Sequence, residues 1–294
     1  GFTGLTRGAN DALQSVTYDA TWSAATAVGS LVTLGSPALA VVGTKLQAVF
    51  LSGPDSGSAD SHKFFRIESS GAGWSAADAV VAASNPSFGP SAPSAAAAGT
   101  DLVMAQDGDN SKLYTQVWNA TWAPAVQIAD PLMTLKTAPP ALVSATGKFD
   151  LVLLYADVTA PHVIGFATRD ATSKAWSNGQ VTQATAQTAE QMSVAAISST
   201  KLLVSFRGND MRPYTMLGTI GATSITWSLP TPLLADTSTV DSAPAVAKGV
   251  CGDDAIAVFA SGGVVKATQY RGTTWSVPGT VPGTTGSRVS VATR

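Results

Sequence analysis

Short apolar runs alternate with polar turns along the whole chain, and their order recurs about every fifty residues. A first run of small apolar residues is followed by a second run that ends in a bulky residue, then by a polar turn and a third, alternating run. The first runs cover 37–42, 92–98, 140–144, 192–197 and 243–247, and the second runs cover 46–51, 102–106, 151–155, 202–207 and 255–260. Alternation with a period of two residues and β-branched enrichment predict strands. No stretch has the pattern of a long amphipathic helix.

A tryptophan closes each repeat. The six members of this set are Trp22, Trp74, Trp122, Trp176, Trp227 and Trp275. A repeat of roughly 40–50 residues with four short strands is typical of a β-propeller blade. We therefore predict an all-β chain that forms a single six-bladed β-propeller with four-stranded blades. Because the six tryptophans recur at one position, we expect them to be structural residues that pack blade on blade. Trp118 lies off the repeat, with Tyr18 and Tyr270 near the equivalent place, and we expect it to pack as well.

The two ends of the chain complement each other. Residues 1–7 match a second strand, whereas residues 287–293 match a first strand. This predicts a ring closed by the C-terminal inner strand, which joins three N-terminal strands and removes exposed sheet edges. The predicted blades are 286–294 with 1–35, then 36–90, 91–137, 138–190, 191–241 and 242–285. An open solenoid is the alternative.

Composition narrows the classes of partner. Charged residues make up 12% of the 294 residues, the net charge is −2, and basic residues are scattered singly. Nucleic acid is therefore not an expected partner. No apolar run approaches the roughly 20 residues that cross a bilayer, so we expect no membrane span. Cys251 is the only cysteine, which excludes an intrachain disulfide. The low-charge composition, rich in Ser, Thr and Ala, suits a secreted bacterial protein, and we expect an extracellular or cell-surface location.

The first repeat carries a resemblance to a known family. Residues 7–13 read Arg-Gly-Ala-Asn-Asp-Ala-Leu and residues 18–23 read Tyr-Asp-Ala-Thr-Trp-Ser. This resembles the repeat of bacterial β-propeller lectins of the Photorhabdus type, to which Trp-closed fucose-binding and tectonin propellers are related. The resemblance covers all six repeats as a pattern and is close only in the first. It implies non-covalent carbohydrate binding in repeated clefts between neighbouring blades.

Polar residues in the turns between second and third strands are the candidate ligand contacts. A saccharide needs an aromatic face and a few convergent polar groups, and Arg, Asp and Asn give directional hydrogen bonds. The candidates are Arg7, Asn10, Asp11, Asp107, Asp109, Asn110, Arg207, Asn209 and Asp210. The alternative is that these residues serve only the hairpin turns, which favour Gly and Asx residues.

Two other functions stay open. The first is a non-catalytic propeller that binds a protein or acts as a scaffold, for which the polar insertions at 52–61 and 157–162 are suited. The second is a sialidase-like glycoside hydrolase, because residues 170–176 superficially resemble an Asp-box turn. Glycosidases need paired carboxylates, and the chain has only two glutamates, Glu68 and Glu190. We therefore expect no enzyme activity, no catalytic residue, no metal and no cofactor. Calcium at residues 107–110 is a minor possibility that no spaced Glu supports.

Overall fold

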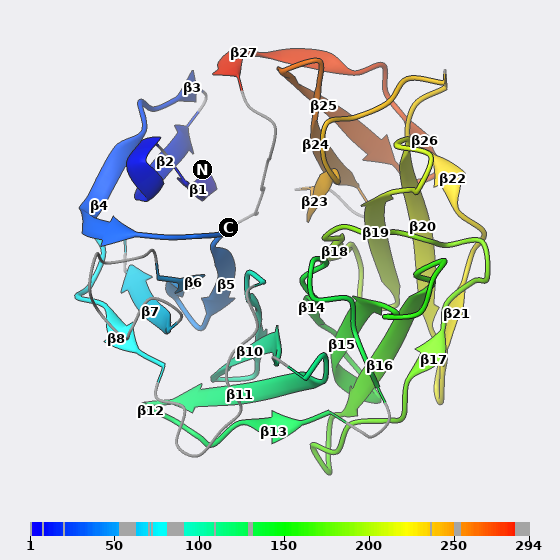
Figure 1. Cartoon of the computed structure of the whole chain (residues 1–294), viewed down its shortest axis with the longest axis horizontal. Coiled ribbons are helices and arrows are strands. Elements are labelled where there is room, and N and C mark those ends of the chain that lie inside the picture. The colour runs from blue at the N-terminus through cyan, green and yellow to red at the C-terminus, as the bar shows by residue number, and fades with distance from the viewer. Residues whose placement is uncertain are drawn as a thin grey trace.

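The computed structural model describes residues 2–7, 9–19, 21–52, 63–69, 71, 73–80, 91–108, 110–128, 132–235, 237–249 and 254–285. These residues form six antiparallel sheets arranged around a common axis, and the chain runs once around the ring (Figure 1). The architecture is the six-bladed β-propeller that the repeat predicts. The described residues include no helix long and apolar enough to cross a membrane.

Each sheet is one blade, which we number in chain order. Blade 1 contains β1 (Phe2–Arg7), the 3-10 turn η1 (Ala9–Asp11), β2 (Ala12–Asp19), β3 (Thr21–Trp22) and β4 (Thr26–Val32). Blade 2 contains β5 (Ala38–Val42), β6 (Lys45–Leu51), β7 (Phe64–Ser69) and β8 (Asp78–Ala79). Blade 3 contains β9 (Ser94–Ala98), β10 (Asp101–Asp107), β11 (Leu113–Asn119), β12 (Thr121–Trp122) and β13 (Val126–Gln127).

The second half of the ring repeats the order. Blade 4 contains β14 (Ala141–Ser144), β15 (Phe149–Ala156), β16 (Ile164–Asp170) and β17 (Gln180–Val181). Blade 5 contains β18 (Ser193–Ala196), β19 (Lys201–Arg207), β20 (Pro213–Ile220), β21 (Ile225–Trp227) and β22 (Thr231–Pro232). Blade 6 contains β23 (Ala245–Lys248), β24 (Ala255–Ser261), β25 (Val264–Arg271), β26 (Thr274–Trp275) and β27 (Gly279–Thr285).

The outer strand differs from the prediction of four strands per blade. In blades 1, 3, 5 and 6 it is split into two segments that both pair with the third strand. Blades 3, 5 and 6 therefore have five strands each, whereas blade 1 has four because its described strands begin with the second strand. In five blades a serine follows the tryptophan, and its hydroxyl accepts a backbone N–H from the third strand whether or not the outer strand is split. In blade 2, Ser75 Oγ accepts the Glu68 N–H at 3.0 Å, and Ser177 Oγ accepts the Thr168 N–H at the same distance in blade 4. The side chain thus takes the place of a ladder bond before the chain pairs again.

The hydrophobic core lies between adjacent blades rather than within any one. Apolar side chains of blades 4 and 5 form one cluster, and the other described interfaces repeat the arrangement. Five of the repeat tryptophans lie in these interfaces, each between its own blade and the preceding one: Trp74, Trp122, Trp176, Trp227 and Trp275. The side chain of Trp22 lies outside the described part.

The inner edge of blade 1 is where closure is predicted. Strand β1 pairs with β2, and it corresponds to the second strands of the other blades, as residues 1–7 predicted. Each of the six sheets falls within one of the predicted blade ranges. The proposed closing strand, 287–293, lies outside the described residues, so closure through that strand stays a prediction.

A charged cleft between blades 2 and 3

The antiparallel order of the strands gives every blade two distinct ends. Turns between first and second strands and between third and fourth strands lie at one end, which we call the cleft face. Turns between second and third strands lie at the other end, which we call the opposite face. A cleft of about 700 Å³ opens on the cleft face between blades 2 and 3. This volume is in the range of small-molecule sites.

Blade 2 supplies most of the polar wall of this cleft. Strand β6 brings Lys45 and Gln47, and strand β7 brings Arg66 and Glu68, which alternate onto the same side of the sheet. Asp78 follows at the start of β8. The register places Gln47 opposite Glu68 and Arg66 opposite Asp78, so side chains from three strands meet at one spot.

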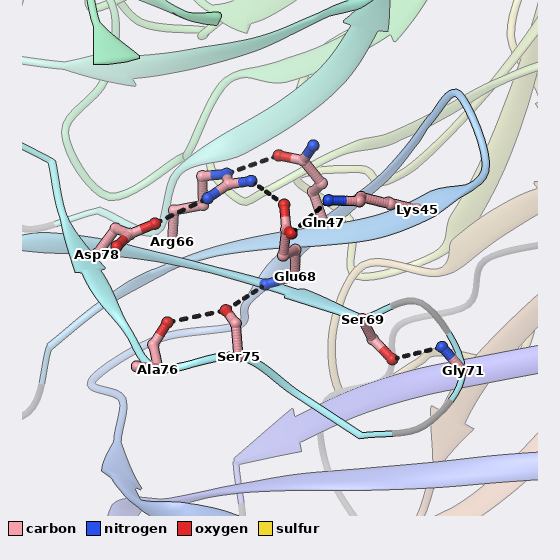
Figure 2. A network of polar contacts seen from close by, with 9 residues as sticks. All are labelled: Lys45, Gln47, Arg66, Glu68, Ser69, Gly71, Ser75, Ala76 and Asp78. Carbon is pink, nitrogen blue, oxygen red and sulfur yellow. Dashed lines mark hydrogen bonds and ion pairs between the residues drawn. The ribbon is translucent and has the colours of Figure 1, made fainter. Parts of the chain in front are cut away.

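Arg66 is the centre of the polar network. Its Nε donates to Gln47 Oε1 at 2.7 Å, its Nη1 donates to Asp78 Oδ2 at 2.8 Å, and its Nη2 donates to Glu68 Oε2. Figure 2 shows the guanidinium enclosed by these three acceptors. Arg66 is only 3% exposed. A buried charge requires such pairing, and the pairing fixes the positions of Gln47, Glu68 and Asp78 around it.

Glu68 links the buried arginine to the surface. Its second oxygen accepts a hydrogen bond from Lys45 Nζ at 2.6 Å. The hydrogen bond from Lys45 and the positive charge of Arg66 hold the pKa of the Glu68 carboxyl below its ordinary value, against the opposing effect of partial burial. Glu68 is thus a stable carboxylate at neutral pH, and it serves as a hydrogen-bond acceptor.

Blade 3 supplies the aromatic wall. Trp118 lies at the end of β11, and its ring centroid is 4.1 Å from the guanidinium carbon of Arg66. This is the geometry of a cation–π contact. Trp118 also meets Trp122 edge on, with centroids 5.5 Å apart. The cleft therefore joins one indole, two cations, two carboxylates and an amide across a blade boundary.

The turn residues that the sequence analysis singled out lie on the opposite face. Arg7 donates to Asp11 Oδ1 at 2.7 Å and to the Leu34 carbonyl at 2.8 Å, which ties blade 1 to the segment leading into blade 2. Arg207 repeats this role, because it pairs with Glu190 and donates to the carbonyls of Val240 and Asp241. Both arginines thus fasten a second strand to neighbouring backbone.

Two Asx residues stabilise these turns by hydrogen bonds to the tyrosine that follows each turn. Asn110 Nδ2 donates to the Tyr114 hydroxyl at 2.9 Å, and in the equivalent turn the Tyr214 hydroxyl donates to Asp210 Oδ2 at 2.7 Å. The bond to Asp210 raises the pKa of Tyr214.

Two further candidates also have hydrogen-bond partners, and a third has a left-handed backbone conformation. Asn209 Nδ2 donates to the Pro161 carbonyl of blade 4 at 3.0 Å. Asp107 is buried and accepts from Ser91 Oγ. Asn10 lies in η1 with a positive φ of 54°.

None of the described candidates lines the cleft between blades 2 and 3. The hydrogen-bonded candidates are Arg7, Asp11, Asp107, Asn110, Arg207, Asn209 and Asp210. Ligand binding by the turn residues stays a prediction. Asp109 lies outside the described residues, so the expectation of no metal at this turn, with calcium as the minor alternative, stays a prediction. Among the described residues, no three His, Cys, Asp or Glu side chains come together to hold a metal ion.

Sequence reasoning missed Lys45, Gln47, Arg66 and Asp78, and it considered Glu68 only as a glutamate count. A signal was present, because Arg66 and Glu68 place two charges at third-strand positions where the other five repeats carry uncharged residues. The repeat pattern reflects what the blades share, whereas this cleft depends on residues at which blade 2 differs from the other blades.

Comparison with known proteins agrees with this architecture. No family model and no curated protein matches the sequence. Among solved structures, the six-bladed fucose-recognising lectin of the fungus Aleuria aurantia is similar, with a TM-score of 0.66 and 16% identity over 96% of this chain and 91% of that one. The lectin SapL1, solved in complex with alpha methyl fucoside, has a TM-score of 0.64 and 12% identity over 95% of this chain and 92% of its own.

A sialidase shares the fold less completely. The NanB sialidase of Streptococcus pneumoniae has a TM-score of 0.54 and 14% identity, and the match covers 88% of this chain and 44% of that one. At these identities the likeness establishes the fold alone. The chain has the six-bladed β-propeller architecture that lectins and a sialidase share.

Proposed function

We propose that this chain binds carbohydrate non-covalently in the cleft between blades 2 and 3. The observation that carries the proposal is the enclosure of Arg66 by Gln47, Glu68 and Asp78 beside the indole of Trp118. A sugar presents hydroxyl groups that need fixed donors and acceptors, and C–H faces that pack on aromatic and apolar surface. The mutual bonds of the network fix its polar groups before the ligand arrives, which lowers the entropic cost of binding.

The similar propellers support this proposal. The Aleuria aurantia lectin is described by its fucose recognition mode, and SapL1 is described in complex with alpha methyl fucoside. We extend the proposal to an exported lectin of the Photorhabdus type, which rests on the motif at residues 7–13 and on the low charge of the chain.

The network favours binding over glycoside hydrolysis. A glycosidase needs a carboxylic acid whose pKa is raised, so that it can protonate the leaving oxygen. The pKa of Glu68 is instead lowered by Lys45 and Arg66, and Asp78 also accepts a bond from Arg66. Both carboxyls are suited to accept hydrogen bonds from hydroxyl groups.

The test is a broad glycan array probed with the full chain, followed by calorimetric titration of each hit. We expect saturable binding that falls at least tenfold in Glu68→Gln and in Arg66→Met. Arg169→Met is the matched control, because Arg169 is also a buried, carboxylate-paired arginine but belongs to blade 4. A blank array at high protein concentration overturns the proposal and favours a protein partner. Hits that survive in both cleft variants while the fold is intact place the sugar elsewhere.

A further inference from the structure

We infer that this chain has one complete sugar site, for a neutral sugar, rather than one site in each cleft between blades. The inference rests on the proposed function and concerns the number and charge preference of its sites. It follows from the strand register, which identifies the residue that stands at each position of the cleft in the other blades.

Arg66 pairs with the outer strand at Asp78, and this pairing identifies its equivalents. They are Ser15, Thr115, Phe166, Thr215 and Ala267. The Glu68 carbonyl accepts a hydrogen bond from the backbone N–H of the residue after the repeat tryptophan. The residues that accept the same bond in the other blades are Thr17, Val117, Thr168, Leu217 and Gln269. Trp118 pairs with a repeat tryptophan, and its equivalents are Tyr18, Ser69, Arg169, Gly218 and Tyr270. At these positions of the described strands, the Arg and Glu occur in blade 2 alone, and the indole occurs in blade 3 alone.

The cleft between blades 3 and 4 has an arginine in place of the aromatic residue, and its bonds are already made. Arg169 forms two parallel bonds of 2.9 Å to the carboxylate of Asp150. Lys174 Nζ donates to the same carboxylate at 2.7 Å. On the blade 3 side, Thr115 and Val117 stand where blade 2 has Arg66 and Glu68, so this cleft has neither the charged pair nor the ring.

The cleft between blades 4 and 5 is filled by the protein itself. Trp227 is 5% exposed, and its ring meets Phe166 edge on with centroids 5.4 Å apart. Gly218 leaves the room for this ring, because a Cβ at Gly218 would lie 2.6 Å from it. The space that a ligand needs is thus occupied by side chains.

The remaining clefts lack the charged pair. Between blades 5 and 6, the uncharged Thr215 and Leu217 take the positions of the pair. Tyr270 takes the position of Trp118, and its hydroxyl donates to the Gly272 carbonyl at 2.7 Å. Between blades 1 and 2, Ser15 and Thr17 stand opposite Ser69. Between blades 6 and 1, the pair is replaced by Ala267 and Gln269.

The exposed charges of the single site favour a neutral ligand. Arg66 is buried, so the groups that a ligand meets are Lys45 and the two carboxylates. The side chains of Glu68 and Asp78 are 27% and 51% exposed, and that of Lys45 is 49% exposed. One accessible cation against two accessible carboxylates disfavours a sugar that carries its own carboxylate or sulfate.

The experiment is equilibrium dialysis of the full chain at saturating sugar, which counts bound molecules per chain. The probes are methyl α-L-fucoside and the methyl glycoside of any other neutral monosaccharide that the array identifies. The expected result is one bound molecule per chain at saturation. The dissociation constant, from dialysis over a range of sugar concentrations, should be at least tenfold higher in Arg66→Met and within a factor of two of the parent in Arg169→Met. The methyl glycoside of N-acetylneuraminic acid should neither bind nor compete.

The outcomes separate this inference from the proposed function. Absence of binding by every sugar contradicts the proposed function. Two or more molecules per chain overturn the single site while sugar binding stands. One molecule per chain with unchanged affinity in Glu68→Gln and Arg66→Met overturns the location of the site in this cleft. Binding of N-acetylneuraminic acid with equal affinity overturns the neutral preference.

Discussion

The guanidinium carbon of Arg66 lies 4.1 Å from the ring centroid of Trp118, and the two residues belong to different blades. The contact joins β7 of blade 2 to β11 of blade 3 across the cleft. Any ligand that enters the cleft therefore meets a surface whose two halves hold each other in place. The hydrogen bonds of Arg66 and the packing of Trp118 therefore stabilise each other across the cleft.

We expect Trp118→Leu to weaken sugar binding at least tenfold, which corresponds to about 1.4 kcal/mol. The substitution removes both the aromatic wall and the partner of Arg66. Trp118→Phe keeps a ring and should give an intermediate affinity, since indole is the better cation–π partner. Calorimetric titration measures both. Trp176→Leu in blade 4 is the control, because it should lower the melting temperature with little change in affinity, and equal losses of affinity in both variants would refute the assignment.

The serines that follow Trp74 and Trp176 give a matched pair of variants. Ser75→Ala and Ser177→Ala each remove a hydroxyl that accepts a third-strand N–H at 3.0 Å. We expect each to lower the free energy of unfolding by about 1 kcal/mol, the usual net value of one hydrogen bond. Ser75 lines the cleft and holds the backbone of Glu68, so only Ser75→Ala should also reduce sugar affinity. Chemical denaturation and titration together measure the difference.

Gly218 should tolerate no side chain. A Cβ at this position would lie 2.6 to 2.9 Å from three ring atoms of Trp227, and such overpacking costs about 1–3 kcal/mol. Gly218→Ala is therefore expected to lower the melting temperature by several degrees. Gly279→Ala is the control, since a Cβ there meets nothing within 4 Å and the residue also lies in a strand. Equal stability of the two variants would contradict the packing of Trp227 over Gly218.

Acid should weaken both the cleft network and sugar binding. Because the pKa of Glu68 in the folded protein is below its ordinary value of 4.5, the stabilising contribution of its carboxylate is complete above about pH 4.5. It is lost as the pH falls through the lowered pKa. Lys45→Met removes the main cause of the lowering, so the acid midpoint for binding should move to higher pH. Lys174→Met, which removes the Asp150 partner in blade 4, should leave that midpoint unchanged. Titrations between pH 3 and pH 7 test both expectations.

The fold could be predicted from the sequence because equivalent apolar residues pack between adjacent blades. Trp74, Trp122, Trp176, Trp227 and Trp275 each lie between two blades, and that shared demand appears as a regular spacing. The cleft could not be predicted in the same way. Arg66 and Glu68 break the repeat, and their partner Trp118 lies on another sheet, so the site exists only where register and blade order bring them together. The recurring turn residues that attracted attention, such as Asp210, recur because they make the same turn.

Substitution of Arg207 distinguishes the two candidate locations of the sugar site, because Arg207 lies on the opposite face from the cleft. Arg207→Ala removes donors to the carbonyls of Val240 and Asp241 and leaves Glu190 without its ion-pair partner. We expect a loss of about 1–3 kcal/mol in the free energy of unfolding, since hydrogen bonds from charged groups lie at the upper end of the usual range. Sugar affinity should stay within a factor of two of the parent, and Arg7→Ala should behave alike. A selective loss of affinity in either variant, with the melting temperature unchanged, would return the site to the turns that the first repeat suggests.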